Sequence, residues 1–171
     1  MLKLAGIVAD SIVDGPGIRV AIFAQGCAHH CEGCHNPETW AFEGGTEISE
    51  EQLVDIVRSN PLAKGVTFSG GEPFAQAEGF AVLAKQLKAL GYEVASYSGY
   101  TFEELQNGTD AQKELLQQLD VLIDGRFELQ SRSLELVFRG SRNQRILDLP
   151  QCLAQGKAVW ETRERWVGEH Q

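Results

Sequence analysis

The sequence is short of positive charge, and the little that it has is not concentrated. Its 171 residues include 15 Lys and Arg against 24 Asp and Glu, which gives a formal net charge of −9. Nucleic-acid binding relies on clustered cationic side chains, and the one Arg-rich stretch, residues 139–145, is short and interrupted. We therefore expect no nucleic-acid partner.

Long apolar runs are also missing from the sequence. No stretch of about 18 apolar residues occurs, and the chain does not begin with a charged and then apolar leader. Internal repeats, linkers and low-complexity tracts are absent as well. We expect a single domain over residues 1–171, a cytoplasmic location and no membrane partner.

Cysteine is scarce, but its placement is informative. Three of the four cysteines fall within eight residues, spaced Cys27-x-x-x-Cys31-x-x-Cys34, and the fourth is Cys152. Three thiols so close together cannot all pair with one another as disulfides. Thiolates are soft ligands that select zinc, copper(I) or iron–sulfur clusters, so this spacing predicts a metal or cluster site in a reducing compartment.

Short apolar runs alternate with helical patterns along the chain. Strands are expected at residues 18–25, 65–69, 93–97 and 121–123, with a fifth at 134–138, and residues 1–9 form either an edge strand or a packed arm. Ser49 and Gln52 predict a capped helix start, and Gly91 predicts a helix end. The fold class is therefore α/β, a mostly parallel sheet with helices outside. Four or five units are too few for a closed barrel of about 250 residues, so we expect an open partial barrel of roughly five to six strands, or a small wound sheet.

Unusual residues follow four of the predicted strands. They are the cysteine segment, Gly70-Gly71-Glu72, Ser98-Gly99 and Asp124-Gly125-Arg126. In parallel α/β folds the carboxyl ends of the strands lie on one face, where ligands bind. We expect the four segments to converge there, although strand ends also need plain glycine turns.

The residues alone leave the bound metal open. Structural zinc takes four ligands, and His29, His30 or His35 could be the fourth. An iron–sulfur cluster would take one thiolate on each of three irons and leave the fourth iron open. Cys152 is a possible fourth ligand, although a distant lone cysteine is more often a small buried apolar residue.

The motifs together resemble a known superfamily. The cysteine spacing followed by Gly-Gly-Glu-Pro at residues 70–73 resembles the radical S-adenosylmethionine superfamily. Residues 13–19 and 36–40 resemble glycyl-radical-enzyme activases, and residues 96–101, 121–127 and 138–145 resemble the anaerobic ribonucleoside-triphosphate reductase activating proteins in particular. Many superfamily members have an aromatic residue before the third cysteine. This chain has Gly33 there, a departure that the reductase activases share.

The resemblance implies an enzyme, a radical S-adenosylmethionine oxidoreductase. Cys27, Cys31 and Cys34 would hold a [4Fe-4S] cluster whose fourth iron chelates S-adenosylmethionine. One electron, from a donor such as a flavodoxin-like protein, would cleave the sulfonium. The resulting 5′-deoxyadenosyl radical would take a hydrogen atom from a glycine of an anaerobic ribonucleoside-triphosphate reductase.

The resemblance also suggests roles for the other site residues. Backbone at Gly33 and His35 would meet the adenine, Gly70 and Gly71 would approach the methionine part, and Glu72 would accept from its ammonium. Ser98 and Asp124 would bond ribose hydroxyls or the amino group, Arg126 would pair with the carboxylate, and residues 14–19 would shape the access of the partner's glycine. Solvated loop residues or ordinary turns are the plain alternative for each. The alternative functions are another small member of the superfamily, either an activase of a different glycyl-radical enzyme or a deazapurine synthase, and a non-catalytic zinc or iron–sulfur module.

Overall fold

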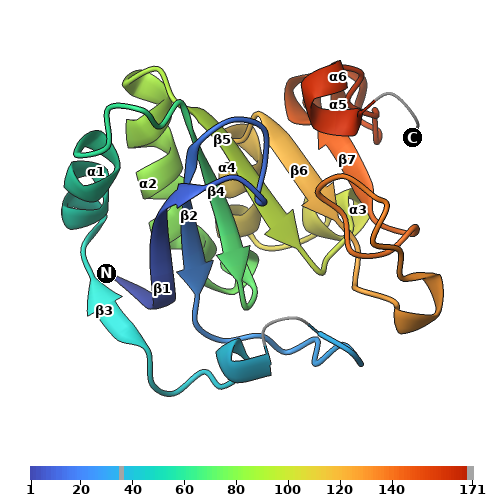
Figure 1. The fold of residues 1–171 in the computed structure, drawn as a ribbon, viewed down its shortest axis with the longest axis horizontal. Coiled ribbons are helices and arrows are strands. Elements are labelled where there is room, and N and C mark those ends of the chain that lie inside the picture. Colours follow the sequence, from blue (N-terminus) through green and yellow to red (C-terminus); the bar gives the residue numbers. More distant parts are fainter. Residues whose placement is uncertain (35–36, 169–171) are drawn as a thin grey trace.

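The computed structural model describes residues 1–34 and 37–168. Over these residues, seven strands form one open sheet in the order β3-β1-β2-β4-β5-β6-β7 (Figure 1). The strands are β1 Leu2–Ser11, β2 Arg19–Ala24, β3 Thr46–Ile48, β4 Gly65–Gly70, β5 Glu93–Ser98, β6 Val121–Asp124 and β7 Arg145–Asp148. The α-helices are α1 Glu50–Arg58, α2 Ala77–Ala89, α3 Phe102–Gln106, α4 Asp110–Gln117, α5 Leu149–Gln155 and α6 Glu164–Val167.

The sheet is mixed, and its centre is parallel. Strands β2, β4, β5 and β6 run parallel to one another, whereas β1, β3 and β7 are antiparallel to their neighbours. The prediction of an α/β fold with parallel strands is confirmed for the centre. The sheet does not close, and both of its edges are antiparallel strands.

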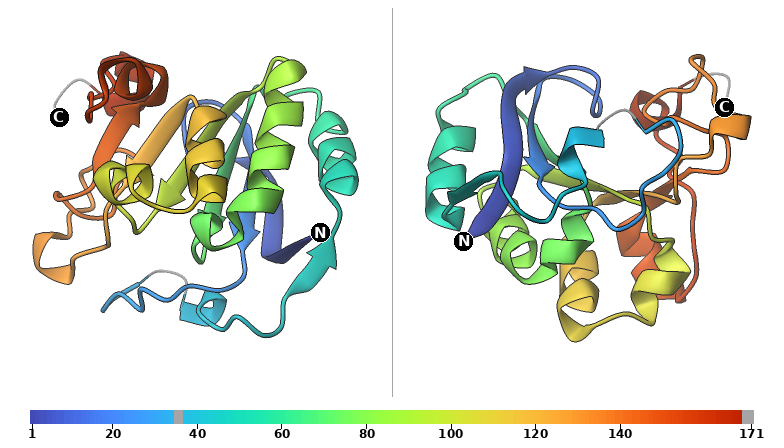
Figure 2. Two further views of the ribbon diagram at one scale, coloured as in Figure 1. Left: turned by 180° about the vertical axis from the view of Figure 1, so that it is seen from behind. Right: turned by 90° about the horizontal axis from the view of Figure 1, so that it is seen from below.

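The two faces of the sheet are covered differently. The larger core lies under α1, α2, α4 and α5, where alternate strand residues such as Phe68 and Leu122 are fully buried. On the other face a smaller cluster gathers Ile123 and Ile146 around Trp166 of α6. Figure 2 shows the main helices along one side of the sheet. The opposite side carries mostly connecting segments instead.

Most predicted elements are present, with three corrections. The expected strands at 18–25, 65–69, 93–97 and 121–123 are β2, β4, β5 and β6, and the Ser49–Gln52 capping box begins α1. The strand expected at 134–138 is wrong, because this run forms turns and Phe138 has a positive φ of 60°. The N-terminal segment is a strand, but β3 covers its outer side, so it is not the edge. Strands β3 and β7 were not expected, so the sheet has seven strands and not the expected five to six.

No helix in the described part of the chain combines the length and apolar character that crossing a membrane requires.

Candidate active site

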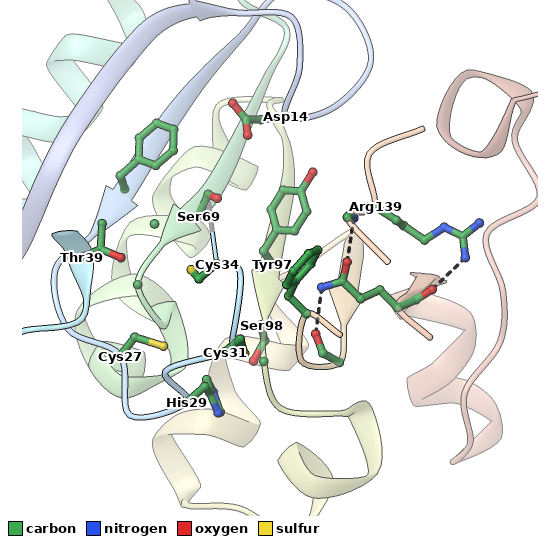
Figure 3. A pocket seen from close by; sticks show the side chains of 18 of the residues that line it. Asp14, Cys27, His29, Cys31, Cys34, Thr39, Ser69, Tyr97, Ser98 and Arg139 are labelled. Carbon is green, nitrogen blue, oxygen red and sulfur yellow. Dashed lines mark hydrogen bonds between the residues drawn. The ribbon is translucent and has the colours of Figure 1, made fainter. Parts of the chain in front are cut away.

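A cavity of about 580 Å³ lies at the carboxyl ends of the parallel strands and continues over the sheet face opposite the main helices (Figure 3). All three clustered cysteines line it, together with the predicted residues Gly70, Gly71 and Ser98. In Figure 1 the arrowheads of β2, β4 and β5 point toward the cysteine loop, residues 25–40. The expected convergence of these segments is therefore observed.

The cysteine loop is closed at its base by backbone hydrogen bonds. Gly26 N donates to Thr39 O at 2.6 Å, and Cys27 N donates to Trp40 O at 3.0 Å. These bonds hold the two ends of the loop together. The cysteines are therefore attached to a fixed base.

Two glycines join the end of β4 to this base. Gly71 N donates to Ala24 O at 2.8 Å, and a Cβ on Gly71 would lie 2.4 Å from Gly26 O. Gly70 has a φ of +87°, and a Cβ there would lie 2.6 Å from Ala24 N. Only glycine fits at either position, because backbone stands where a side chain would begin. Gly70 thus permits a close approach to the end of β2, and Gly71 a close approach to Gly26 in the cysteine loop.

The thiols are ligands of the kind that a cluster needs. Cys27 is buried, and Cys31 and Cys34 are half-buried; burial raises the pKa of the Cys27 and Cys31 thiols. A cluster is a larger body than a single ion and takes each thiolate on a different iron. Three soft thiols that line one cavity fit such a group.

Glu72 joins three segments of the site. Its buried carboxylate lies 2.7 Å from His29 Nε2 and accepts from Gly99 N at 2.7 Å and from Phe74 N at 3.0 Å. It also accepts from Ser98 Oγ at 2.9 Å. The carboxylate thus ties the cysteine loop to the ends of β4 and β5 and does not line the cavity itself.

Asp124 is held by a cation that the sequence did not reveal. Arg145 lies opposite it in the β6–β7 pair, and the two side chains form an ion pair at 2.5 Å. Arg145 also pairs with Glu103 at 2.7 Å; its hydrogen bonds with Asp124 and Glu103 raise the pKa of Arg145. Asp124 is buried and does not line the cavity.

Arg126 turns toward the cysteine loop from outside the cavity. Its side chain is 48% exposed, and Arg126 Nε donates to His29 Nδ1 at 3.2 Å. Because a guanidinium can only donate, His29 Nδ1 accepts and Nε2 carries the proton given to Glu72. Gly33 lies beside the cavity-lining Cys34, and His35 is outside the described residues.

Several lining residues were not among the predicted site residues, although most of them lie in the segments that carry the family resemblance. Phe127, Leu136, Phe138, Arg139 and Gly140 come from the β6–β7 connection, residues 125–144. Tyr97 comes from β5, and its hydroxyl donates to Phe138 O at 2.9 Å. Only Phe127 directly follows a predicted site segment; the others depend on how the connection folds back.

Comparison with known proteins gives the site its class. Residues 13–147 match the family described as "4Fe-4S single cluster domain". The chain is 37% identical over 144 residues to the anaerobic ribonucleoside-triphosphate reductase-activating protein of Pasteurella multocida (strain Pm70), covering 79% of this chain and 90% of that one. The protein of the same name from Vibrio cholerae serotype O1 is 34% identical with the same coverage. A pyruvate formate-lyase-activating enzyme from Clostridium pasteurianum is 39% identical over 119 residues, which is 64% of this chain and 50% of that enzyme.

The class is therefore that of iron–sulfur proteins with a single [4Fe-4S] cluster domain. The thiols described above are the residues able to hold such a cluster. At these identities and coverages, the chain belongs to the family of anaerobic ribonucleoside-triphosphate reductase-activating proteins.

Proposed function

We propose that the protein is a radical S-adenosylmethionine activase that generates a glycyl radical on an anaerobic ribonucleoside-triphosphate reductase. The single observation that carries this proposal is the placement of Cys27, Cys31 and Cys34 around one cavity at the ends of the parallel strands. Family membership supports the target, since the relatives are named for activating that reductase.

In this proposal the three cysteines hold the cluster and leave one iron without a protein ligand. When bound, the reduced cluster supplies the electron that cleaves S-adenosylmethionine to methionine and a 5′-deoxyadenosyl radical, which takes hydrogen from the partner's glycine. The chain's own contribution is to orient the cofactor and exclude water. The electron comes from a donor such as a flavodoxin-like protein. Clustered thiols kept reduced suit the cytoplasm.

The cavity residues have distinct proposed roles. Gly70, Gly71 and Ser98 line the cavity with the thiols, which supports contact with the methionine and ribose parts, and backbone at Gly33 and His35 meets the adenine. The remaining three residues are already bonded within the protein. Glu72 is bonded to His29, Arg126 donates to His29 through Nε, and Asp124 is paired with Arg145.

The open sheet supports access for a protein substrate. The face carrying the cavity has no layer of main helices over it (Figure 2). All described strands belong to one sheet, which supports the proposal of one domain over residues 1–171. We propose that the whole sheet, with the cavity on this face, is the expected open partial barrel. A glycine-bearing segment of the reductase reaches the cavity from the open side, past residues 14–19.

The test is direct. Protein reconstituted anaerobically with iron and sulfide, then given dithionite and S-adenosylmethionine, should release 5′-deoxyadenosine. Incubation with the reductase should then give a glycyl-radical doublet by electron paramagnetic resonance. Zinc content without cleavage would reject the radical mechanism.

The second candidate is activation of a different glycyl-radical enzyme. It is favoured by the 39% identity to a pyruvate formate-lyase-activating enzyme. Cleavage without a doublet on the reductase, together with a doublet on pyruvate formate-lyase, would select it.

A further inference from the structure

Phe127 lies beside the cysteine loop but belongs to the β6–β7 connection. Its half-buried side chain lines the cavity with Cys31 and Cys34. Its backbone also hydrogen-bonds the Cys31 thiol. The phenyl ring is therefore attached next to a thiol that would hold the cluster.

Two glycines lie next to opposite ends of this ring. A Cβ on Gly33 would lie 3.2 Å from Phe127 Cε1, and a Cβ on Gly140 would lie 2.9 Å from Phe127 Cδ2. Cε1 and Cδ2 are para-related atoms, so the ring spans the gap between the cysteine loop and the far end of the connection. Gly33 also has a φ of +75°, which disfavours any side chain there. The space that a side chain before the third cysteine would occupy is thus taken by Leu129 and by the edge of the Phe127 ring, both from another segment.

We propose that Phe127 is a binding residue for the adenine base of S-adenosylmethionine and supplies the aromatic wall that the cysteine loop lacks at Gly33. This inference rests on the proposed function. The ligand's amino-acid end must reach the iron near the thiols, so its planar base needs a flat apolar surface within the same cavity. Bases stack favourably on aromatic rings, and a ring held at both ends loses little freedom on binding.

Four other aromatic residues line the cavity: Phe23, Trp40, Tyr97 and Phe138. Phe23 belongs to β2, and Trp40 stacks on His30 with ring centroids 4.5 Å apart. Tyr97 points along the sheet toward Asp14 and away from Cys31 (Figure 3), and its hydroxyl bonds Phe138 O. Phe138 packs edge-on against Trp166, with ring centroids 5.6 Å apart. Phe127 is the cavity ring that adjoins the cysteine loop through Gly33.

The experiment measures cofactor affinity rather than turnover. S-adenosylmethionine is titrated into the cluster-loaded protein without reductant, so that it is not cleaved, and the dissociation constant is measured by isothermal titration calorimetry. Phe127→Ala should weaken binding roughly tenfold to hundredfold, the range expected for loss of one stacked base. Phe127→Tyr, which keeps the ring, should stay within about threefold of the wild type.

Leu129→Ala is the matched control. Leu129 Cδ1 fills the space beside Gly33, 2.8 Å from a Cβ there, yet Leu129 is not among the cavity-lining residues. It should keep near-wild-type affinity, whereas equal losses in both alanine variants would overturn the inference and indicate packing alone. Should Phe127→Ala fail to load iron, Phe127→Leu keeps apolar bulk without a ring and should still bind more weakly.

The outcomes separate the inference from the proposed function. Wild-type protein that neither binds nor cleaves S-adenosylmethionine rejects the function itself. Wild-type binding matched by Phe127→Ala and Phe127→Leu rejects only the role of Phe127.

Discussion

His29 Nε2 and Glu72 Oε1 lie 2.7 Å apart, and their side chains are only 6% and 1% exposed. This bond joins the middle of the cysteine loop to the segment that follows β4. Arg126 completes the arrangement from the other side of the imidazole. The orientation of the loop between Cys27 and Cys31 is thus fixed by a carboxylate 43 residues away in sequence.

Replacing His29 should loosen the cysteine loop. His29→Ala removes one donor from a buried carboxylate, which should cost about 1–3 kcal/mol of unfolding free energy and reduce iron retention during gel filtration. His30→Ala is the control, because His30 is exposed and stacks on Trp40 with ring centroids 4.5 Å apart. Equal iron retention in the two variants would contradict the role assigned to the His29–Glu72 bond.

Cys152 should be separable from the cluster thiols. It belongs to α5 and is fully buried, and its sulfur accepts from Val159 N at 3.1 Å. Cys152→Ala should lower stability by about 1–2 kcal/mol and leave the iron content per chain unchanged. Cys27→Ala should instead abolish iron binding. Iron loss in Cys152→Ala would show that the distant thiol is a ligand.

Stability should depend on Glu93 at neutral pH and not in acid. Burial alone would raise the pKa of Glu93, but hydrogen bonds from Arg165 and Arg19 and their charges hold it below its usual value. A depressed carboxyl pKa gives stability that is fully present above the ordinary value of 4.5 and is lost as pH falls through the folded-state value.

Glu93→Gln leaves Arg19, whose side chain is 2% exposed, without its carboxylate. It should cost about 3 kcal/mol at pH 7, measured by urea unfolding, and the difference from wild type should shrink below pH 4.5. A difference that is independent of pH would argue against the ion pair as its source.

Trp166 should support the cavity floor through Phe138. The indole is fully buried, packs edge-on against Phe138, and lies 5.1 Å from the Arg19 guanidinium carbon. Trp166→Ala should cost about 3–5 kcal/mol of unfolding free energy. The control is Trp160→Ala, since Trp160 is 46% exposed and should change stability by less than about 1 kcal/mol. Similar losses in both variants would be evidence against a core role for α6.

The parallel strands were predictable because burial shaped their composition. All four residues of β6 are buried, and such a strand reads as a short apolar run in the sequence. The antiparallel strands carry weaker patterns. Thr46–Ile48 is short and largely exposed, and Arg145–Asp148 begins and ends with charges. Their strand conformation depends on pairing with β1 and β6, which local sequence does not encode.

The incorrect strand at 134–138 has a physical explanation. Its apolar residues do not pair in a sheet; Leu136 and Phe138 line the cavity, and Phe138 also packs against the cluster around Trp166. An apolar run that lines a cavity has the same composition as a strand. In the same way, the sequence alone suggests that Asp124 is free to bind a ligand. In the structure β7 places Arg145 opposite it. The cysteine loop could be predicted as a metal or cluster site because three thiols in so short a span have few other functions.

The closed base of the cysteine loop sets an order of assembly. The bonds Gly26 N to Thr39 O and Cys27 N to Trp40 O join the two ends of the loop through protein alone. The conformational entropy of bringing them together is therefore spent during folding and not when iron arrives, unlike in zinc fingers, which fold only around their metal. Iron-free protein should accordingly unfold cooperatively in urea, and a chelator should remove iron from the chain without unfolding it. The cluster should then be inserted after the chain has folded.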